Sequence, residues 1–127
     1  MRKNYIAGEW VASDDAVENR NPSDITDLIG LYAQASSAQL KAAIDAAGAA
    51  QKTWQATGLE ARQTALMTIG NALMARADEL GELLSREEGK PRAEGRGEIY
   101  RAGQFFTYYA AEVLRQIGDN ADSVRPG

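Results

Sequence analysis

Ser85-Arg86-Glu87-Glu88-Gly89-Lys90-Pro91 stands where one long helical pattern ends and another begins. The acidic pair 87–88 ends a run of helix formers, Gly89 can adopt the left-handed conformation that closes a helix, and Pro91 suits the first turn of the next helix. Helix-stop chemistry accounts for every residue of this segment. The stretch therefore predicts a structural joint between two helices.

The 127 residues allow one domain, or part of one, with a modest core: 44% of them are hydrophobic. Fourteen basic and 18 acidic residues give a net charge of -4, which argues against a nucleic-acid partner. No apolar run approaches the roughly 20 residues of a membrane span, and the start of the chain lacks the apolar core of a signal peptide. We therefore expect a soluble, cytoplasmic protein with no membrane or nucleic-acid partner.

The chain contains no histidine and no cysteine. This excludes an ordinary zinc site, a histidine-based triad and a thiolate nucleophile. Carboxylates, lysines and tyrosines remain for acid–base work, but these side chains are common on solvated helix faces. The sequence therefore predicts no metal site and no catalytic residue on this chain.

Short strands are predicted over residues 1–35. Apolar residues flank Ala7-Gly8, where glycine permits the positive φ of a tight hairpin, and a second turn follows at Asn21-Pro22-Ser23-Asp24. The segment from Leu28 to Ala35 is then strand-like. So few short strands form a marginal sheet with open edges, which indicates that further structure covers them.

Helices are predicted over residues 36–118. Ser36 and Gln39 form a capping box for a helix from about Ser37 to Gln55. A second box at Thr57 and Glu60 opens a periodic run of about thirty residues, which is longer than an ordinary globular helix.

Two positions interrupt the later helical pattern. A bend or break is expected between Arg76 and Gly81, where Asp78 and Gly81 interrupt the helix formers. After the joint, a third helix is expected from about Arg92 to Ile117, with Gly118 as its stop and a loop over residues 119–127.

The glycines of the third helix do not form a dinucleotide loop. No strand precedes Gly95-Arg96-Gly97, and Tyr100 stands where the third glycine would be. Because glycine weakens a helix by about 1 kcal/mol against alanine, Gly95, Gly97 and Gly103 instead predict close approach of a neighbouring element.

Four aromatic side chains share about two turns of this helix: Phe105, Phe106, Tyr108 and Tyr109. They cannot all face one apolar stripe, so some must meet a substrate tunnel, another subunit or, the interpretation we favour, another layer of the same protein. Arg101 lies one turn earlier. An ion pair with Glu98 is favoured over a role in binding a substrate carboxylate.

Five segments occur in an order that carries a family resemblance: Ile6 to Val11, Asn19 to Pro22, Ala42 to Trp54, Glu87 to Pro91, and Tyr108-Tyr109-Ala110. Together they resemble the N-terminal portion of NAD(P)-dependent aldehyde dehydrogenases across nearly the whole chain. The resemblance implies a mostly α fold with a short N-terminal antiparallel β element, in the outer layer of an α/β cofactor-binding domain. Residues 1–127 would then be a single N-terminal segment of that domain, incomplete without downstream sequence.

The resemblance also implies a function for the parent protein, which would oxidise an aldehyde to an acid with NAD or NADP through a thiolate. The family's nucleophilic cysteine, general-base glutamate, oxyanion-hole asparagine and glycine-rich cofactor loop have no counterpart here. We therefore expect no catalytic and no cofactor-binding residue on this chain, which would be inactive alone.

The same resemblance implies a substrate class and partners. The turn from Asn21 to Gly30 is similar to that of members acting on semialdehydes such as 2-oxoglutarate semialdehyde. Arg101 and Phe105 would lie at the substrate entrance, and the partners would be the remainder of the polypeptide and further copies in a homodimer or homotetramer. The alternative is a stand-alone helical protein-interaction module without catalysis.

Overall fold

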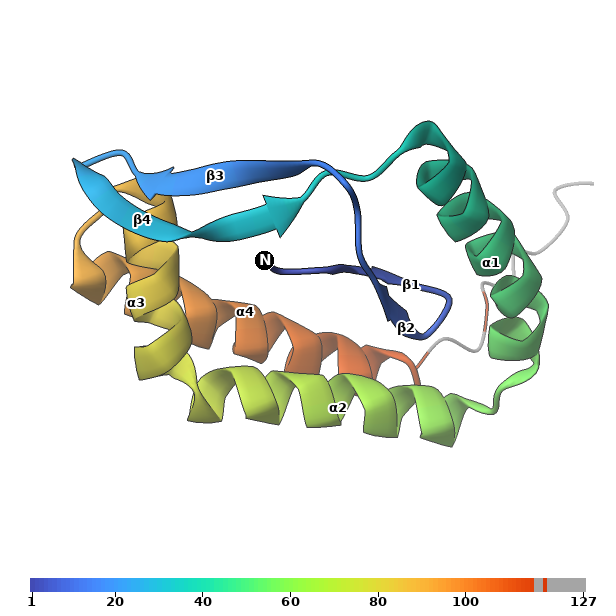
Figure 1. Ribbon diagram of the computed structural model, residues 1–127. Coiled ribbons are helices and arrows are strands. Elements are labelled where there is room, and N and C mark those ends of the chain that lie inside the picture. The colour runs from blue at the N-terminus through green and yellow to red at the C-terminus, as the bar shows by residue number, and fades with distance from the viewer. Residues whose placement is uncertain (116–117, 119–127) are drawn as a thin grey trace, which may run out of the picture.

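The structure is a computed structural model that describes residues 1–115 and 118. In chain order the described elements are β1 (Asn4–Ile6), β2 (Glu9–Val11), β3 (Ala16–Asn21), β4 (Asp24–Ala33), α1 (Ser37–Ala56), α2 (Leu59–Ala75), α3 (Ala77–Glu88) and α4 (Arg92–Glu112). Figure 1 shows α2 and α4 side by side, with the strands and α1 beside this helix pair. The mostly helical fold with a small antiparallel β element is confirmed.

The first hairpin pairs β1 with β2, with Tyr5 opposite Trp10. Its turn residues Ala7 and Gly8 have φ angles of 53° and 89°, the positive values that a two-residue hairpin turn requires. The rings of Tyr5 and Trp10 lie 5.0 Å apart on one face of the hairpin. The predicted hairpin is confirmed.

The second hairpin pairs β3 with β4, with register shifts on either side of Arg20. It turns at Pro22 and Ser23, where the Ser23 backbone N–H donates to Asn21 Oδ1 at 2.9 Å. The second strand is longer than predicted and starts directly after the turn, at Asp24.

The predicted capping box is present at the start of α1 but not at the start of α2. Ser36 and Gln39 form the reciprocal capping box at the start of α1. The predicted box at Thr57 and Glu60 is wrong, because Gly58 is the N-cap of α2. The Thr57 hydroxyl instead donates to the Thr53 carbonyl oxygen at 3.0 Å, so this side chain belongs to the end of α1.

The long periodic run breaks at Arg76, within the predicted interval. Arg76 has φ -107° and ψ 20°, between the end of α2 and the start of α3. Its guanidinium reaches both carboxylate oxygens of Glu79, at 2.9 and 2.7 Å. Figure 1 shows α3 leaving α2 at a sharp angle at this point.

The joint at the end of α3 is confirmed. Gly89 has φ 71°, and its N–H donates to the Ser85 carbonyl oxygen at 2.8 Å. Pro91 is the N-cap of α4. This last helix ends earlier than predicted, at Glu112 rather than Ile117, and the predicted loop at residues 119–127 lies outside the described residues.

Glycines bring the helix backbones into contact. A Cβ on Gly103 of α4 would lie 2.7 Å from the Gly70 carbonyl oxygen of α2, and one on Gly95 would lie 2.5 Å from the Gly81 carbonyl oxygen of α3. The prediction of close approach is confirmed at these positions. It is wrong for Gly97, which is exposed: a Cβ added there would point into open space, away from any neighbouring element.

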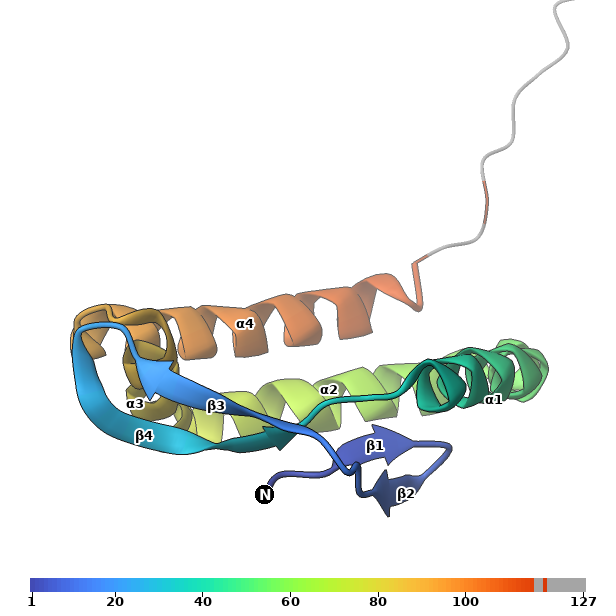
Figure 2. The same ribbon diagram turned by 45° about the horizontal axis from the view of Figure 1, so that its top comes forward.

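Little apolar surface is buried by these contacts. Within the described part of the chain, the buried hydrophobic residues are Ala77 and Ala110. Figure 2 shows the β1–β2 hairpin and α1 standing apart from α4. None of the described helices is long and apolar enough to cross a membrane.

Candidate functional site

The two predicted entrance residues lie on the side of α4 that faces away from α2. Arg101, Gln104, Phe105, Tyr108 and Tyr109 line a shallow depression of about 310 Å³ there. Helical spacing puts these positions opposite Gly103 and Ala110, which pack against the rest of the fold. The structure therefore brings Arg101 and Phe105 together on one surface.

Arg101 does not form the predicted ion pair with Glu98. The Glu98 carboxylate instead accepts from Lys90 Nζ at 2.6 Å, across the joint. Among residues 1–115 and 118, no ion pair or side-chain hydrogen bond involves Arg101. Its guanidinium is thus available to a ligand on the described surface.

The aromatic residues of α4 divide between two sides of the helix, as expected. Phe105, Tyr108 and Tyr109 are 57–59% exposed, whereas Phe106 is half-buried. The rings of Tyr108 and Tyr109 meet edge to face, with centroids 5.3 Å apart. The exposed three form an apolar wall beside Arg101.

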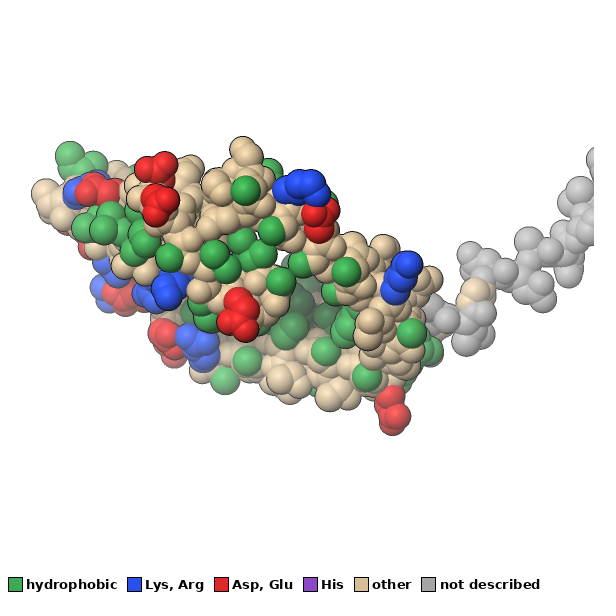
Figure 3. All heavy atoms as spheres, turned by 45° about the vertical axis from the view of Figure 1, so that its right-hand side comes forward, with side chains coloured by type: hydrophobic (Ala, Val, Ile, Leu, Met, Phe, Trp, Pro, Cys, Tyr) green, Lys and Arg blue, Asp and Glu red, His purple; other side chains and the backbone are tan. Residues whose placement is uncertain are grey.

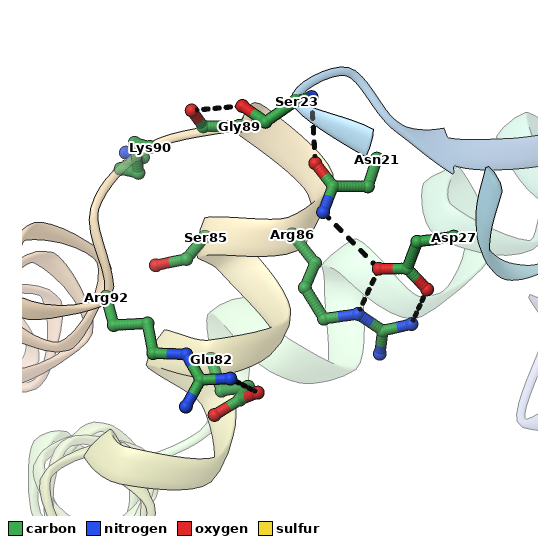
Figure 4. Close-up of a pocket in the computed structure, with 9 residues that line it drawn as sticks. All are labelled: Asn21, Ser23, Asp27, Glu82, Ser85, Arg86, Gly89, Lys90 and Arg92. Atoms are coloured by element: carbon green, nitrogen blue, oxygen red, sulfur yellow. Dashed lines mark hydrogen bonds and ion pairs between the residues drawn. The ribbon is translucent and has the colours of Figure 1, made fainter. Parts of the chain in front are cut away.

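A second depression, of about 270 Å³, lies at the joint and is polar (Figure 4). Arg86 of α3 holds Asp27 of β4 with two hydrogen bonds, from Nε to Oδ2 at 2.9 Å and from Nη2 to Oδ1 at 2.6 Å. Asn21 Nδ2 donates to the same carboxylate at 3.3 Å. The Arg86 guanidinium lowers the pKa of Asp27 below its ordinary value.

Three further hydrogen bonds attach the second hairpin to the joint. Asn19 Nδ2 and the Tyr32 hydroxyl donate to Glu87 Oε1 at 2.8 and 3.2 Å, and the Ser23 hydroxyl donates to the Gly89 carbonyl oxygen at 2.8 Å. We call this set of contacts, together with the Arg86–Asp27 pair, the hairpin clamp. The clamp was not anticipated, because its partners are 55–68 positions apart in sequence.

Lys90 completes the joint. Its ammonium lies 2.5 Å from a Glu88 carboxylate oxygen and 2.6 Å from one of Glu98, and these two acids raise the pKa of Lys90. The polar groups of the joint are thus paired with one another rather than left open to a ligand. This supports the structural interpretation of the sequence 85–91.

Replacing Asp27 with Asn tests the clamp through its pH dependence. A carboxyl group whose pKa is lowered on folding adds stability above its unfolded pKa, and this stability is lost as the pH falls through the folded value. In the wild type, the urea concentration at the midpoint of unfolding should therefore decrease as the pH is lowered below about 4. In Asp27→Asn this decrease should be less steep.

A matched control for this experiment is Asp45→Asn. Asp45 pairs with Lys41 one turn away on the surface of α1, so its loss should leave the acid limb of the curve unchanged. Equal flattening by both variants would contradict a specific role for the Arg86–Asp27 pair.

The glycine pair of α4 does not form a dinucleotide loop, as predicted. The sequence has no cysteine or histidine, and no metal-binding cluster of acidic residues occurs in residues 1–115 and 118. Gly95-Arg96-Gly97 lies inside α4, with Gly95 buried against Gly81 of α3, so it cannot cradle a dinucleotide.

Comparison with known proteins identifies the family. The sequence profile of the aldehyde dehydrogenase family matches residues 10–127. The chain is 38% identical over 113 residues to an alpha-ketoglutarate semialdehyde dehydrogenase of Haloferax volcanii, covering 87% of this chain and 23% of that protein. It is 36% identical over 116 residues to the NADP(+) succinate-semialdehyde dehydrogenase of Escherichia coli, covering 90% of this chain and 24% of that protein.

The fold agrees with the sequence match. The crystal structure of an aldehyde dehydrogenase from Brucella melitensis biovar abortus 2308 superposes with a TM-score of 0.90 at 30% identity, over 100% of this chain and 26% of that one. The chain belongs to the aldehyde dehydrogenase family, and it matches the N-terminal portion of the fold. It spans about a quarter of the length of the relatives it matches.

Proposed function

We propose that this chain is the N-terminal part of an enzyme that oxidises an aldehyde to the carboxylic acid with NAD or NADP. The observation that carries the proposal is the family match over residues 10–127. The relative from Escherichia coli is named for NADP(+), which supports a nicotinamide cofactor. The catalytic groups and the cofactor site would come from the three quarters of the fold that these residues do not include.

We further propose that the substrate is a semialdehyde with a carboxylate at its other end, such as 2-oxoglutarate semialdehyde. Both named relatives act on such semialdehydes by name. Arg101 supports the proposal because its charge is not paired within the described residues and stands beside an apolar wall. A guanidinium binds a carboxylate through charge-assisted hydrogen bonds, and the wall would contact the carbon chain.

A chimera tests the activity. In this protein, residues 1–127 replace the matching segment of the Escherichia coli succinate-semialdehyde dehydrogenase. We expect the chimera to reduce NADP with succinate semialdehyde, and the 127-residue chain alone to show no activity. A chimera that is folded by circular dichroism and elutes as a defined oligomer, yet is inactive with both NAD and NADP, would contradict the proposal.

We further propose that the whole enzyme is a homodimer or homotetramer, as the resemblance implies. The mass of the chimera in solution, measured by light scattering, tests this second expectation. A monomer with full activity would exclude it.

A further inference from the structure

The acid that helical spacing pairs with Arg101 is held elsewhere in the structure. Glu98 lies three residues before Arg101 on α4, a spacing at which side chains of opposite charge can meet. A helical side chain leans over the turn before its own Cα, so the stem of Arg101 is expected to lean toward the turn that carries Glu98. Glu98 nevertheless accepts from Lys90 Nζ at 2.6 Å. Arg101 therefore has an acidic neighbour within reach with which it is not paired.

The backbone of the joint holds Lys90 in place. Its N–H donates to the Ser85 carbonyl oxygen at 3.1 Å, as the residue after a left-handed helix cap does. Gly89 before it has φ 71°, and Pro91 after it has φ -58°, the value that the proline ring imposes. The position of Lys90 relative to α4 is thus set by the fold of the joint.

The pair of Lys90 with Glu98 is stronger than an exposed pair of Glu98 with Arg101 would be. The Lys90 side chain is only 15% exposed, and its ammonium also lies 2.5 Å from a carboxylate oxygen of Glu88. A largely buried charge loses more than an exposed one when a partner is removed, whereas an exposed ion pair one turn apart contributes little. This difference explains why Glu98 pairs with Lys90 across the joint.

Arg101 differs from the other arginines of α3 and α4. Each of the others pairs with an acid at 2.6–2.7 Å: Arg86 with Asp27, Arg92 with Glu82 and Arg96 with Asp78. On the face drawn in Figure 3, too, several basic side chains lie directly beside acidic ones. Within residues 1–115 and 118, Arg101 has no such partner, and the acid nearest to it along the helix is the one that Lys90 holds.

We infer that Lys90 is a positioning residue for substrate binding: it holds Glu98 away from Arg101 and so leaves the Arg101 guanidinium available to the substrate carboxylate. The inference rests on the proposed role of Arg101 in binding a semialdehyde. Without the Lys90 ammonium, Glu98 would compete for Arg101, and its negative charge would repel an anionic substrate. Lys90 thus has a task beyond ending a helix, for which Gly89 and Pro91 suffice.

The test uses steady-state kinetics of the chimera described above. Lys90→Met should raise the KM for succinate semialdehyde about three- to fivefold, less than the loss of Arg101 itself, because competition by Glu98 leaves part of the guanidinium available. The KM for propanal, which has no carboxylate, should not change. Lys90→Arg should keep the original KM, because a guanidinium can also pair with Glu98. The double variant Lys90→Met/Glu98→Gln should restore it, because no acid then competes for Arg101.

Arg96→Met is the matched control. It removes one positive charge from α4 and releases Asp78 of α3, so the net charge changes as in Lys90→Met while Glu98 stays with Lys90. It should leave the KM for succinate semialdehyde unchanged. An equal rise in this control, a rise that persists in the double variant, or no rise in Lys90→Met would each overturn the inference.

A crystal structure of the Lys90→Met chimera gives a readout besides activity. The Glu98 carboxylate should then lie within about 4 Å of the Arg101 guanidinium, and a Glu98 that stays apart from it would overturn the inference. If Arg101→Met leaves the KM for succinate semialdehyde unchanged, the proposed function fails and the inference fails with it. A rise in Arg101→Met without one in Lys90→Met overturns the inference alone. If Lys90→Met does not fold, Lys90→Gln gives the same test, because it keeps a polar group between the two acids.

Discussion

Replacing Gly95 with alanine is expected to lower the free energy of unfolding by about 2–3 kcal/mol. The added Cβ would lie 2.5 Å from the Gly81 carbonyl oxygen and would also overlap the Ser85 hydroxyl. A backbone oxygen cannot move aside without shifting α3, so the loss outweighs the roughly 1 kcal/mol that alanine gains in a helix. Amide hydrogen exchange of α3 and α4 in the chimera, where the rest of the fold is present, measures the change.

Gly97→Ala is the matched control on the same helix. Gly97 is two residues away and exposed, and a Cβ added there would point into open space. Its replacement should raise the free energy of unfolding by about 0.5–1 kcal/mol through helix propensity alone. Destabilisation by both variants, or by neither, would show that the α3–α4 contact does not depend on a glycine at position 95.

Replacing Arg101 with methionine is expected to raise the KM of the chimera for succinate semialdehyde about tenfold or more, equivalent to about 1.4 kcal/mol. The loss follows from removing the charged side chain that lines the depression together with Phe105 and Tyr108. An uncharged aldehyde such as propanal should be oxidised as before, because methionine keeps the apolar stem of the side chain. Steady-state kinetics with both aldehydes separates the two effects.

Arg92→Met provides the comparison for Arg101. Arg92 begins the same helix, but its guanidinium is paired with Glu82 at 2.7 Å and belongs to the joint. Replacing Arg92 should change neither the KM for succinate semialdehyde nor the KM for propanal. If Arg101→Met raised the KM equally for the charged and the uncharged aldehyde, Arg101 would not bind the substrate carboxylate.

Local chemistry was predictable from the sequence. The Ser36 capping box, the positive φ angles at Gly8 and Gly89 and the break at Arg76 each depend on residues within one or two turns. The Thr57 box was wrong for an equally local reason: Thr57 already bonds back to Thr53, and Gly58 takes the capping position. A capping box is therefore a weak signal where another helix has just ended.

Contacts between distant residues were not predictable. Glu98 lies three residues from Arg101, yet it pairs with Lys90, which the turn at Gly89 brings close. Likewise, the partners of the hairpin clamp are common polar residues with no motif, and their pairing depends on how α3 and β4 meet in space. The proximity of Arg101 and Phe105, by contrast, was predictable, because the two residues lie on neighbouring turns of one helix.

The hairpin clamp also has a consequence for the order of folding. Helices α2, α3 and α4 are consecutive, whereas Asp27 and Arg86 close a loop of 59 positions. Closing such a loop costs about 3–4 kcal/mol in chain entropy, and this is recovered only when several clamp contacts form together. We therefore expect the hairpin to join last and to leave first, so that Asp27→Asn speeds unfolding and leaves the folding rate unchanged, with a φ-value near zero.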